Sequence, residues 1–169
     1  MNKIGLFYIT GAIKTSNIAR CIKEAFGRKV KIDIISVECV SHNNFDEYDN
    51  LIIGTSTWSD GTLPVFWDEI INDIEKIDLS GKKVAIFGLG DQVNYPDNFV
   101  DGIGILAEAF ESTGAVIVGR TSPQGYTFNR SLALNDNMFD GLAIDIENQS
   151  ELTKQRIYDW VELLQNEFN

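Results

Sequence analysis

Five short runs of apolar and β-branched residues recur along the chain, separated by segments with helical periodicity, and this alternation restricts the fold more than any other feature. The runs are residues 4–8, 32–37, 51–53, 84–87 and 116–118. Runs of this length without polar alternation are typical of strands that are covered on both faces. The sequence therefore predicts an α/β fold with a parallel sheet, because helical crossovers between parallel strands provide such cover.

Three segments that lie between or after these runs have apolar residues at helical spacing. Such spacing gives a helix one face that packs on a sheet. Gly114 is a C-terminal stop signal for the second helix, and Ser150 or Thr153 can cap the third. Together with the strands, the helices indicate five βα units and a doubly wound sheet with helices on both faces. The three apolar faces are Ile18, Ile22 and Phe26, then Phe99, Ile103, Leu106 and Phe110, and last Ile157, Trp160, Val161, Leu164 and Phe168.

Residues 120–140 form a polar, turn-rich insertion that holds Pro123, Gly125 and several Asn and Asp residues. The insertion interrupts the fifth strand, which we expect to resume at residues 142–144. A loop of this length either has a function or packs as a small subdomain, and we expect structural packing here. The chain has 169 residues, 44% of them hydrophobic, which is enough for one continuous core. Residues 1–169 are therefore predicted to form a single domain.

The chain is acidic, with 25 Asp and Glu against 14 Lys and Arg and a formal net charge of −11. This charge argues against binding to nucleic acid or to an anionic membrane, because those polyanions attract basic surfaces. A partner protein with a basic surface fits better, although acidic charge can also serve solubility alone. No apolar stretch approaches the roughly 20 residues of a membrane span, and no secretory signal is visible, so we expect a cytoplasmic protein.

The residues that carry most enzyme chemistry are sparse. Cys21 and Cys39 are too far apart in sequence for a metal pair and too few for a disulfide framework, so structural thiols are expected. His42 lies in a polar stretch and is interpreted as a solvated surface residue. The sequence offers no paired carboxylates, Ser-His-Asp set or metal-ligand spacing. Its chemistry must therefore belong to a cofactor.

Ligands of open α/β sheets bind beyond the carboxyl ends of the strands, near the point where the strand order reverses. Residues 9–15 follow the first strand and open a helix, so their N–H groups suit a phosphate. Thr10 and Thr15 add hydroxyl donors. A nucleoside-triphosphatase loop needs a glycine directly before its Lys-Thr pair, but Ile13 stands there before Lys14. The pattern therefore favours a phosphate site of another kind.

Two further loops follow the third and fourth strands, and each presents an aromatic residue. Residues 55–62 place Trp58 among small polar residues, so we expect its ring to be partly exposed. Residues 88–98 hold Tyr95 and two glycines that let the backbone approach a ligand. Two aromatic residues at one sheet edge can enclose a planar ring. Each feature alone is explained by packing, a turn or a cap, and only their joint placement favours a ligand site.

At these residues the chain resembles a flavodoxin of the long-chain type along nearly its whole length, the insertion being similar to that type's characteristic loop. The resemblance implies non-covalently bound FMN, with Trp58 against one face of the isoalloxazine ring and Tyr95 against the other. It also implies that the backbone at Gly90 and Asp91, with Asn98 nearby, holds the pyrimidine edge of the ring. The most specific stretches are residues 87–99 (FGLGDQVNYPDNF), the Thr57-Trp58 pair, residues 124–128 (QGYTF) and residues 145–150 (DIENQS).

The resemblance extends to function. It implies a low-potential one-electron carrier rather than an enzyme, in which acidic residues such as Asp60, Asp91 and Asp97 disfavour the anionic reduced flavin. It also implies that the peptide between Ser59 and Asp60 reorients on reduction, with Gly61 giving the loop freedom. The expected partners are basic-surfaced redox proteins, such as a flavodoxin or ferredoxin reductase and acceptor oxidoreductases, and a monomer is expected.

The phosphate loop departs from the family pattern Thr/Ser-x-Thr-Gly-x-Thr. The chain reads TGAIKT over residues 10–15, so Ala12 lacks the expected hydroxyl and Ile13 replaces a glycine. A hydrogen bond to a charged group contributes roughly 1.5–3 kcal/mol, and a β-branched residue at positive φ costs around 1–3 kcal/mol. We therefore expect weakened but retained FMN binding. The alternatives are a binding or regulatory module that has lost FMN, and an FMN-dependent reductase, for which no extra substrate element is visible.

The predicted strand order is 2-1-3-4-5, the order for which flavodoxin itself is a standard example, and it brings all three loops to one crevice. The residues predicted to bind the cofactor are Thr10, Gly11, Ala12, Ile13, Lys14, Thr15, Ser56, Thr57, Trp58, Ser59, Asp60, Gly61, Gly88, Leu89, Gly90, Asp91, Tyr95 and Asn98.

Overall fold

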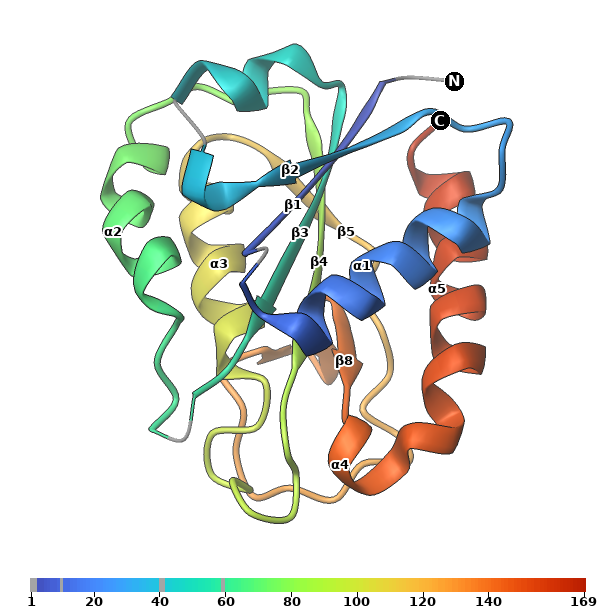
Figure 1. Cartoon of the computed structure of the whole chain (residues 1–169). Coiled ribbons are helices and arrows are strands. Elements are labelled where there is room, and N and C mark those ends of the chain that lie inside the picture. The colour runs from blue at the N-terminus through green and yellow to red at the C-terminus, as the bar shows by residue number, and fades with distance from the viewer. Residues whose placement is uncertain (1–2, 10, 40–41, 59) are drawn as a thin grey trace.

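The computed structural model describes residues 3–9, 11–39, 42–58 and 60–169, and for residues 42 and 43 it describes the backbone only. Strands and helices alternate along most of the chain (Figure 1). The strands are β1 (Ile4–Tyr8), β2 (Ile32–Ser36), β3 (Asn50–Ser56), β4 (Lys83–Leu89), β5 (Val116–Val118), β6 (Leu134–Asn135), β7 (Met138–Phe139) and β8 (Leu142–Ile144). The α-helices are α1 (Ile13–Phe26), α2 (Val65–Ile74), α3 (Asp101–Ser112), α4 (Ile146–Gln149) and α5 (Thr153–Glu167), and 3-10 helices form η1 (Val37–Cys39), η2 (His42–Glu47) and η3 (Ser150–Leu152).

The main sheet is parallel and has the strand order β2-β1-β3-β4-β5, with β8 also paired to β4. Strand β5 pairs with residues 83–85 of β4, and β8 pairs with residues 87–89 of the same strand. The two short strands are therefore two pieces of one edge strand, separated by the insertion. The predicted order and the interrupted fifth strand are both confirmed.

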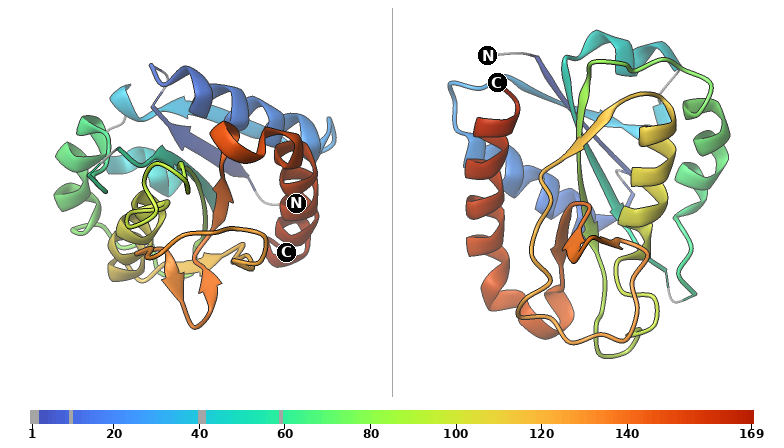
Figure 2. Two further views of the ribbon diagram at one scale, coloured as in Figure 1. Left: turned by 90° about the horizontal axis from the view of Figure 1, so that it is seen from below. Right: turned by 180° about the vertical axis from the view of Figure 1, so that it is seen from behind.

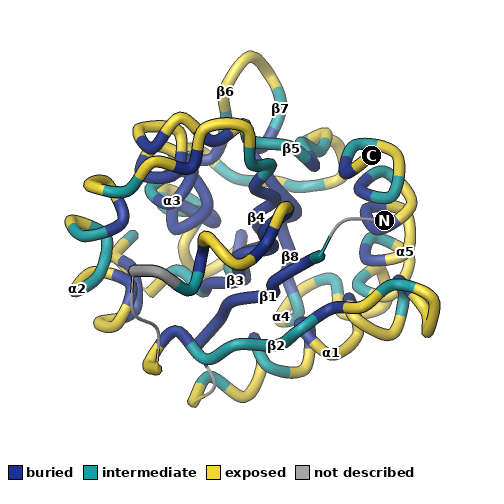
Figure 3. The backbone as a smooth tube through the Cα atoms, turned by 90° about the horizontal axis from the view of Figure 1, so that it is seen from above, coloured by how far each residue is buried: buried dark blue, intermediate teal, exposed yellow. Residues whose placement is uncertain are grey.

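Helices cover both faces of this sheet, as predicted. Helices α1 and α5 lie side by side on one face, and α2 and α3 lie on the other (Figure 1 and Figure 2). The central strands β1, β3 and β4 are buried, the edge strands β2 and β5 are only partly buried, and the outer sides of the helices are exposed (Figure 3). Two apolar cores result. Ile22 of α1 and Trp160 of α5 belong to the core on one face, and Ile103 and Phe110 of α3 belong to the core on the other.

Three details differ from the predicted elements. The described residues between β2 and β3 form η1 and η2, so this crossover is not the α-helical unit that five βα repeats require. Helix α2 has no counterpart among the predicted apolar faces, because Phe66 is exposed beside the fully buried Trp67 and blurs the pattern. The predicted N-cap of the last helix is also wrong. Asp145 supplies a cap earlier, at α4, and the helical turn η3 then leads directly into α5 at Thr153.

The insertion packs on the core through aromatic side chains, in agreement with its predicted role. The ring centroid of Phe99 lies 5.5 Å from that of Tyr126 and 5.3 Å from that of Phe128. The hydroxyl of Tyr126 donates a 2.6 Å hydrogen bond to the carbonyl oxygen of Ala143 in β8. Strands β6 and β7 form a hairpin that projects from this edge of the molecule (Figure 2). The insertion is thus tied to the second half of the edge strand.

Several expectations concern single residues or whole elements. Cys21 and Cys39 are free and exposed, so neither is a buried structural thiol. The side chain of His42 lies outside the described part of the structure. In the described ranges, no helix combines the length and the apolar composition needed to cross a membrane. Those ranges also contain no group of three or more side chains placed to hold a metal ion.

Candidate functional site

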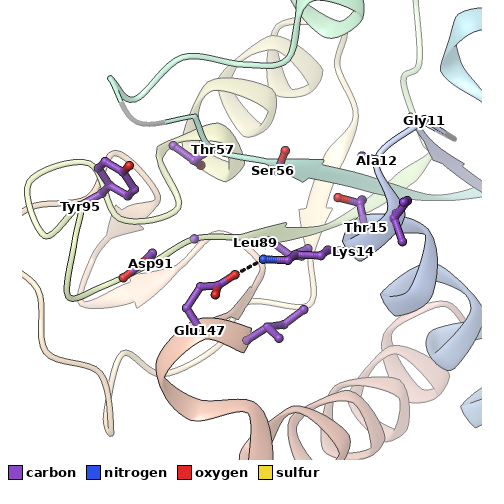
Figure 4. Close-up of a pocket in the computed structure, with 13 residues that line it drawn as sticks. Gly11, Ala12, Lys14, Thr15, Ser56, Thr57, Leu89, Asp91, Tyr95 and Glu147 are labelled. Carbon is purple, nitrogen blue, oxygen red and sulfur yellow. Dashed lines mark hydrogen bonds and ion pairs between the residues drawn. The ribbon is translucent and has the colours of Figure 1, made fainter.

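A cavity of about 470 Å³ opens at the carboxyl ends of β1, β3 and β4. It lies where the strand order reverses, since β2 and β3 pair with opposite edges of β1. Ligands of doubly wound sheets bind at this position, and small-molecule sites have volumes of about 300–1,000 Å³. The described residues that line it are Gly11, Ala12, Ile13, Lys14, Thr15, Ser56, Thr57, Leu89, Gly90, Asp91, Tyr95, Ile146 and Glu147 (Figure 4).

The first wall is the turn that enters α1. Ala12 is the N-cap residue, and its methyl group leaves the first N–H groups of the helix without a side-chain cap. Such N–H groups, together with the helix dipole, suit an anion. Thr15 is buried in the first turn. Ile13 is exposed and has helical backbone, so the strain expected for a β-branched residue at positive φ does not arise. Thr10 lies outside the described residues.

The second wall is anchored by Thr57, directly after β3. Its N–H donates to the carbonyl oxygen of Leu89 (3.0 Å), and its hydroxyl oxygen accepts from the N–H of Gly102 (2.9 Å). Thr57 therefore joins β3 to β4 and to the first turn of α3. Ser56 precedes it and also lines the cavity.

The turn that follows carries Trp58, which is 53% exposed, as predicted. The carbonyl oxygen of Trp58 accepts from the N–H of Gly61 (2.9 Å), and Gly61 has a φ of 81°, a conformation that favours glycine. A hydrogen bond from the hydroxyl of Thr62 (2.7 Å) holds the pKa of Asp60 below its ordinary value. Ser59 lies outside the described residues, so the reorientation of its peptide bond with Asp60 stays a prediction.

The third wall begins inside β4. Gly88 and Leu89 belong to this strand rather than to the loop predicted for them. Gly88 makes room for α3, because a Cβ atom there would lie 2.5 Å from Cγ1 of Ile103. Gly90 follows the strand, and a Cβ atom there would lie 2.9 Å from Cγ1 of the buried Val100. Glycine is therefore needed at position 90 for packing against Val100, and the backbone of Gly90 also lines the cavity.

The carboxylate of Asp91 is held by the loop that it begins. Its oxygens accept from the N–H groups of Val93 (3.1 Å) and Asn94 (2.9 Å) and from the side-chain amides of Asn94 (2.7 Å) and Asn148 (2.9 Å). Partial burial opposes ionisation, but the hydrogen bonds outweigh it, so the pKa of Asp91 lies below its ordinary value. This wall therefore carries a fixed negative charge at neutral pH.

A buried hydrogen-bond network stands behind the third wall. Asp145 accepts from the backbone N–H (3.1 Å) and the side-chain amide (2.7 Å) of Gln92, and from the N–H of Asn148 (3.0 Å). The side-chain oxygen of Gln92 accepts from the N–H of Thr127 in the insertion (2.6 Å). The network joins the third wall, α4 and the insertion. The insertion therefore supports the site through residues that do not line the cavity.

The two ends of the cavity differ in character. Tyr95, which is 43% exposed, lies at one end, and the entrance to α1 lies at the other (Figure 4). Asn98 stands beside this site, where its amide donates to Asp101 (3.2 Å) and lies 2.6 Å from the place of a Cβ atom on Gly61. The described residues of the predicted set that do not line the cavity are Trp58, Asp60, Gly61, Gly88 and Asn98.

Two lining residues are absent from the predicted set. Ile146 and Glu147 open α4, directly after the buried Asp145. The carboxylate of Glu147 accepts a hydrogen bond from the ammonium group of Lys14 across the cavity (Figure 4). Residues 145–150 are one of the stretches that carry the resemblance. They also follow the second half of the fifth strand, and that position at the same sheet edge is the signal that could have placed Glu147 here.

Comparison with known proteins agrees with this geometry. A family model described as flavodoxin matches residues 6–160. A flavodoxin of Synechococcus elongatus is 46% identical over 168 residues, which cover 99% of this chain and 99% of the relative. A flavodoxin of a Nostoc strain is 44% identical and covers 98% of this chain and 97% of the relative. The crystal structure of Fusobacterium nucleatum flavodoxin bound to flavin mononucleotide has a TM-score of 0.94 and 34% sequence identity, with 100% of both chains covered.

Proposed function

This chain belongs to the flavodoxin family, and from that premise we propose that it is a low-potential one-electron carrier that binds FMN non-covalently. The observation that carries the proposal is the cavity at the switch point of the sheet. One end is an uncapped helix N-terminus, and the other combines Tyr95 with the backbone of Gly90. A ligand with a phosphate at one end and a planar ring at the other fits these two ends. The protein is an electron-transfer carrier and not an enzyme.

The residues of the three walls have distinct roles in this proposal. The N–H groups that open α1 hold the phosphate, together with the hydroxyls of Thr10 and Thr15. Trp58 and Tyr95 cover the two faces of the ring. The backbone at Gly90 and the loop that begins there hold the ring's polar edge. The flavin supplies the one-electron chemistry, and the protein supplies position and electrostatics.

Acidic residues near the end of the cavity that would hold the flavin ring set the direction in which the protein shifts the flavin's reduction potential. Asp91 is ionised at neutral pH, and its hydrogen bonds lower its pKa further. Asp60 also has a lowered pKa, and Asp97 is exposed, where its carboxylate accepts from the side-chain amide of Asn129 (3.0 Å). Negative charges near the ring disfavour further negative charge on it, and about 59 mV corresponds to a tenfold change for one electron. These residues therefore favour a strong, low-potential donor.

The partners that we propose are redox proteins with basic surfaces, such as a flavodoxin or ferredoxin reductase and acceptor oxidoreductases. Two features support this. The net charge is −11, which steers association toward positive surfaces, and Trp58 and Tyr95 are about half exposed beside the cavity. The acidic charge disfavours nucleic acid and anionic membranes as partners. A monomeric, single-domain carrier in the cytoplasm stays a prediction.

The alternative of a binding module that has lost FMN is not favoured. A module of that kind has no need for an open phosphate end. In this chain the phosphate end stays open, because Ile13 adopts helical backbone without positive φ and its side chain is exposed. Of the two departures in the phosphate loop, only the missing hydroxyl at Ala12 then lowers the affinity for the phosphate.

The proposal is tested by the visible spectrum of the purified protein, followed by titration of the apoprotein with FMN while the quenching of flavin fluorescence is recorded. A yellow protein that quenches FMN stoichiometrically is expected. A redox titration of the same sample then measures both one-electron potentials, and the second should lie below that of free FMN. A colourless protein that does not quench micromolar FMN would overturn the proposal.

A further inference from the structure

An ion pair crosses the cavity between two helices that are far apart in the chain. Lys14 lies in the first turn of α1 and Glu147 in the first turn of α4, 133 residues further on. Their side chains are 63% and 47% exposed. Among the described residues that line the cavity, Lys14 is the one cation. The pair therefore joins the phosphate end of the cavity to the wall that Asp145 supports.

The position of Lys14 is unfavourable unless an anion lies near it. The N-terminus of a helix carries partial positive charge, so a cation in the first turn is disfavoured. α1 has no acidic residue in its own first turn, and Ala12 provides no side-chain cap. Glu147 supplies the nearby negative charge from another helix. This arrangement places a carboxylate beside the group that an anionic ligand of α1 would contact.

A phosphate monoester is the stronger partner for this ammonium group. It carries about −1.5 to −2 charges at neutral pH and has three acceptor oxygens, whereas a carboxylate carries one charge and two oxygens. An ion pair between exposed side chains contributes little, because both groups can be hydrated instead. Lysine has a long, flexible side chain, so Lys14 can turn from Glu147 toward the N-terminus of its own helix.

We propose that Lys14 contacts the FMN phosphate in this chain and that Glu147 competes for it, so that Lys14 exchanges Glu147 for the phosphate when FMN binds. The inference rests on the proposed function and deepens it. It gives the chain a charged phosphate contact where Ala12 lacks a hydroxyl. It also makes Glu147 a residue that weakens FMN binding although it lines the site.

The test compares FMN with riboflavin, which has the same ring and no phosphate, in fluorescence titrations of the apoprotein. Glu147→Gln is expected to tighten FMN about two- to fivefold and to leave riboflavin unchanged, because the competing pair is weak. Lys14→Met is expected to weaken FMN about tenfold or more, again with riboflavin unchanged. In the Lys14→Met background, Glu147→Gln should have no further effect.

Two matched variants separate this exchange from the general effect of charge. Glu151→Gln removes the same negative charge from an exposed residue of η3, the turn that follows α4. Lys23→Met removes a cation from the exposed last turn of the same helix as Lys14. Neither should change the ratio of FMN affinity to riboflavin affinity. If Glu151→Gln tightens FMN as much as Glu147→Gln does, long-range charge explains the effect and the exchange is wrong.

The remaining outcomes distinguish the inference from the proposed function. Suppose that the wild-type protein binds FMN and that Glu147→Gln weakens the binding of FMN and of riboflavin by the same factor. The pair of Lys14 and Glu147 then closes over the bound ring, and the exchange is overturned. Unchanged FMN affinity in Glu147→Gln overturns it as well, while the carrier function stands. A wild-type protein that binds neither flavin overturns both.

Discussion

The side-chain amide of Gln92 donates a 2.7 Å hydrogen bond to a carboxylate oxygen of Asp145, and both side chains are buried. The other oxygen of Asp145 accepts from the N–H of Asn148 and so caps α4. One carboxylate therefore holds both the loop of the third wall and the helix that carries Glu147. The spacing of these two walls of the cavity depends on this side chain.

Replacement of Asp145 with alanine is expected to lower the free energy of unfolding by about 3 kcal/mol. The change leaves the donors of Gln92 without an acceptor, at about 1–3 kcal/mol, and removes the cap of α4, at about 0.5–2 kcal/mol. Asp145→Asn is the matched variant, because it keeps the side-chain volume and one acceptor oxygen. Its free energy of unfolding should fall by less than that of Asp145→Ala. Urea unfolding of the apoprotein at pH 7 measures both. An Asp145→Ala variant as stable as the wild type would show that the network carries no stability.

Most of the sheet could be predicted because its strands are short runs of apolar and β-branched residues, and those of β1, β3 and β4 are buried on both faces. Residues 4–8, 116–118 and 142–144 are strands with the predicted limits. Helix α2 could not be found in the same way, since Val65 and Phe66 are exposed and Trp67 is buried, so apolar residues do not mark one face. The crossover that contains η1 and η2 shows no apolar residues at helical spacing. An α-helix was expected there only because strands and helices alternate in the neighbouring segments.

The candidate site was predictable where a loop directly follows a strand. Gly11, Thr57 and Gly90 all line the cavity for that reason. Glu147 also follows a strand, the second half of the fifth, but its residue type gave no sign of a site, because an acidic residue in the first turn of a helix is ordinary on its own. Its contact with Lys14 joins residues far apart in sequence, and local patterns carry no information about such contacts.

A substitution at Gly104 tests how closely the insertion packs on α3. Alanine in place of glycine inside a helix ordinarily stabilises a protein by roughly 0.5–1 kcal/mol. Here a Cβ atom would lie 2.2 Å from the backbone carbonyl oxygen of Leu132, which cannot move without the insertion. Gly104→Ala is therefore expected to destabilise the protein by about 1–3 kcal/mol in urea unfolding. Glu108→Ala, at an exposed position one turn further along α3, should be nearly neutral. A more stable Gly104→Ala would contradict this close contact.

The raised pKa of Tyr126 leads us to expect a loss of folding stability at alkaline pH. Burial raises the pKa of Tyr126 to about 12, although the nearby Arg156 opposes the rise. Because the folded pKa is raised, the contribution of the neutral phenol is fully present below pH about 10 and is lost as the pH rises toward 12. Tyr126→Phe lacks the hydrogen bond to Ala143 and should be less stable at pH 8 by about 0.5–1.5 kcal/mol. This deficit in the free energy of unfolding, relative to the wild type, should shrink between pH 10 and 12.

Urea unfolding at several pH values measures this convergence. Tyr158→Phe is the control, because Tyr158 is half exposed on α5, and its curve should run parallel to that of the wild type. If the deficit of Tyr126→Phe stays constant up to pH 12, then Tyr126 does not titrate with a raised pKa.

The missing hydroxyl of the phosphate loop predicts a gain of function. Ala12 has an extended backbone, with φ −87° and ψ 95°, which a threonine side chain accepts without strain. A hydroxyl there can donate to the FMN phosphate, and a hydrogen bond to a charged group contributes about 1.5–3 kcal/mol, or about 10- to 150-fold in affinity. Ala12→Thr is therefore expected to tighten FMN by at least about tenfold in a fluorescence titration. Riboflavin, which has no phosphate, should bind as before.

The control for Ala12→Thr is Ala12→Val, which has nearly the same shape and no hydroxyl. Threonine at an N-cap also stabilises a helix, by about 0.5–2 kcal/mol, so Ala12→Thr should raise the stability of the apoprotein while Ala12→Val does not. The two roles compete, because the oxygen that caps α1 must turn to meet the phosphate. A gain in apoprotein stability without a gain in FMN affinity would mean that the hydroxyl stays on the helix and adds no contact to the phosphate.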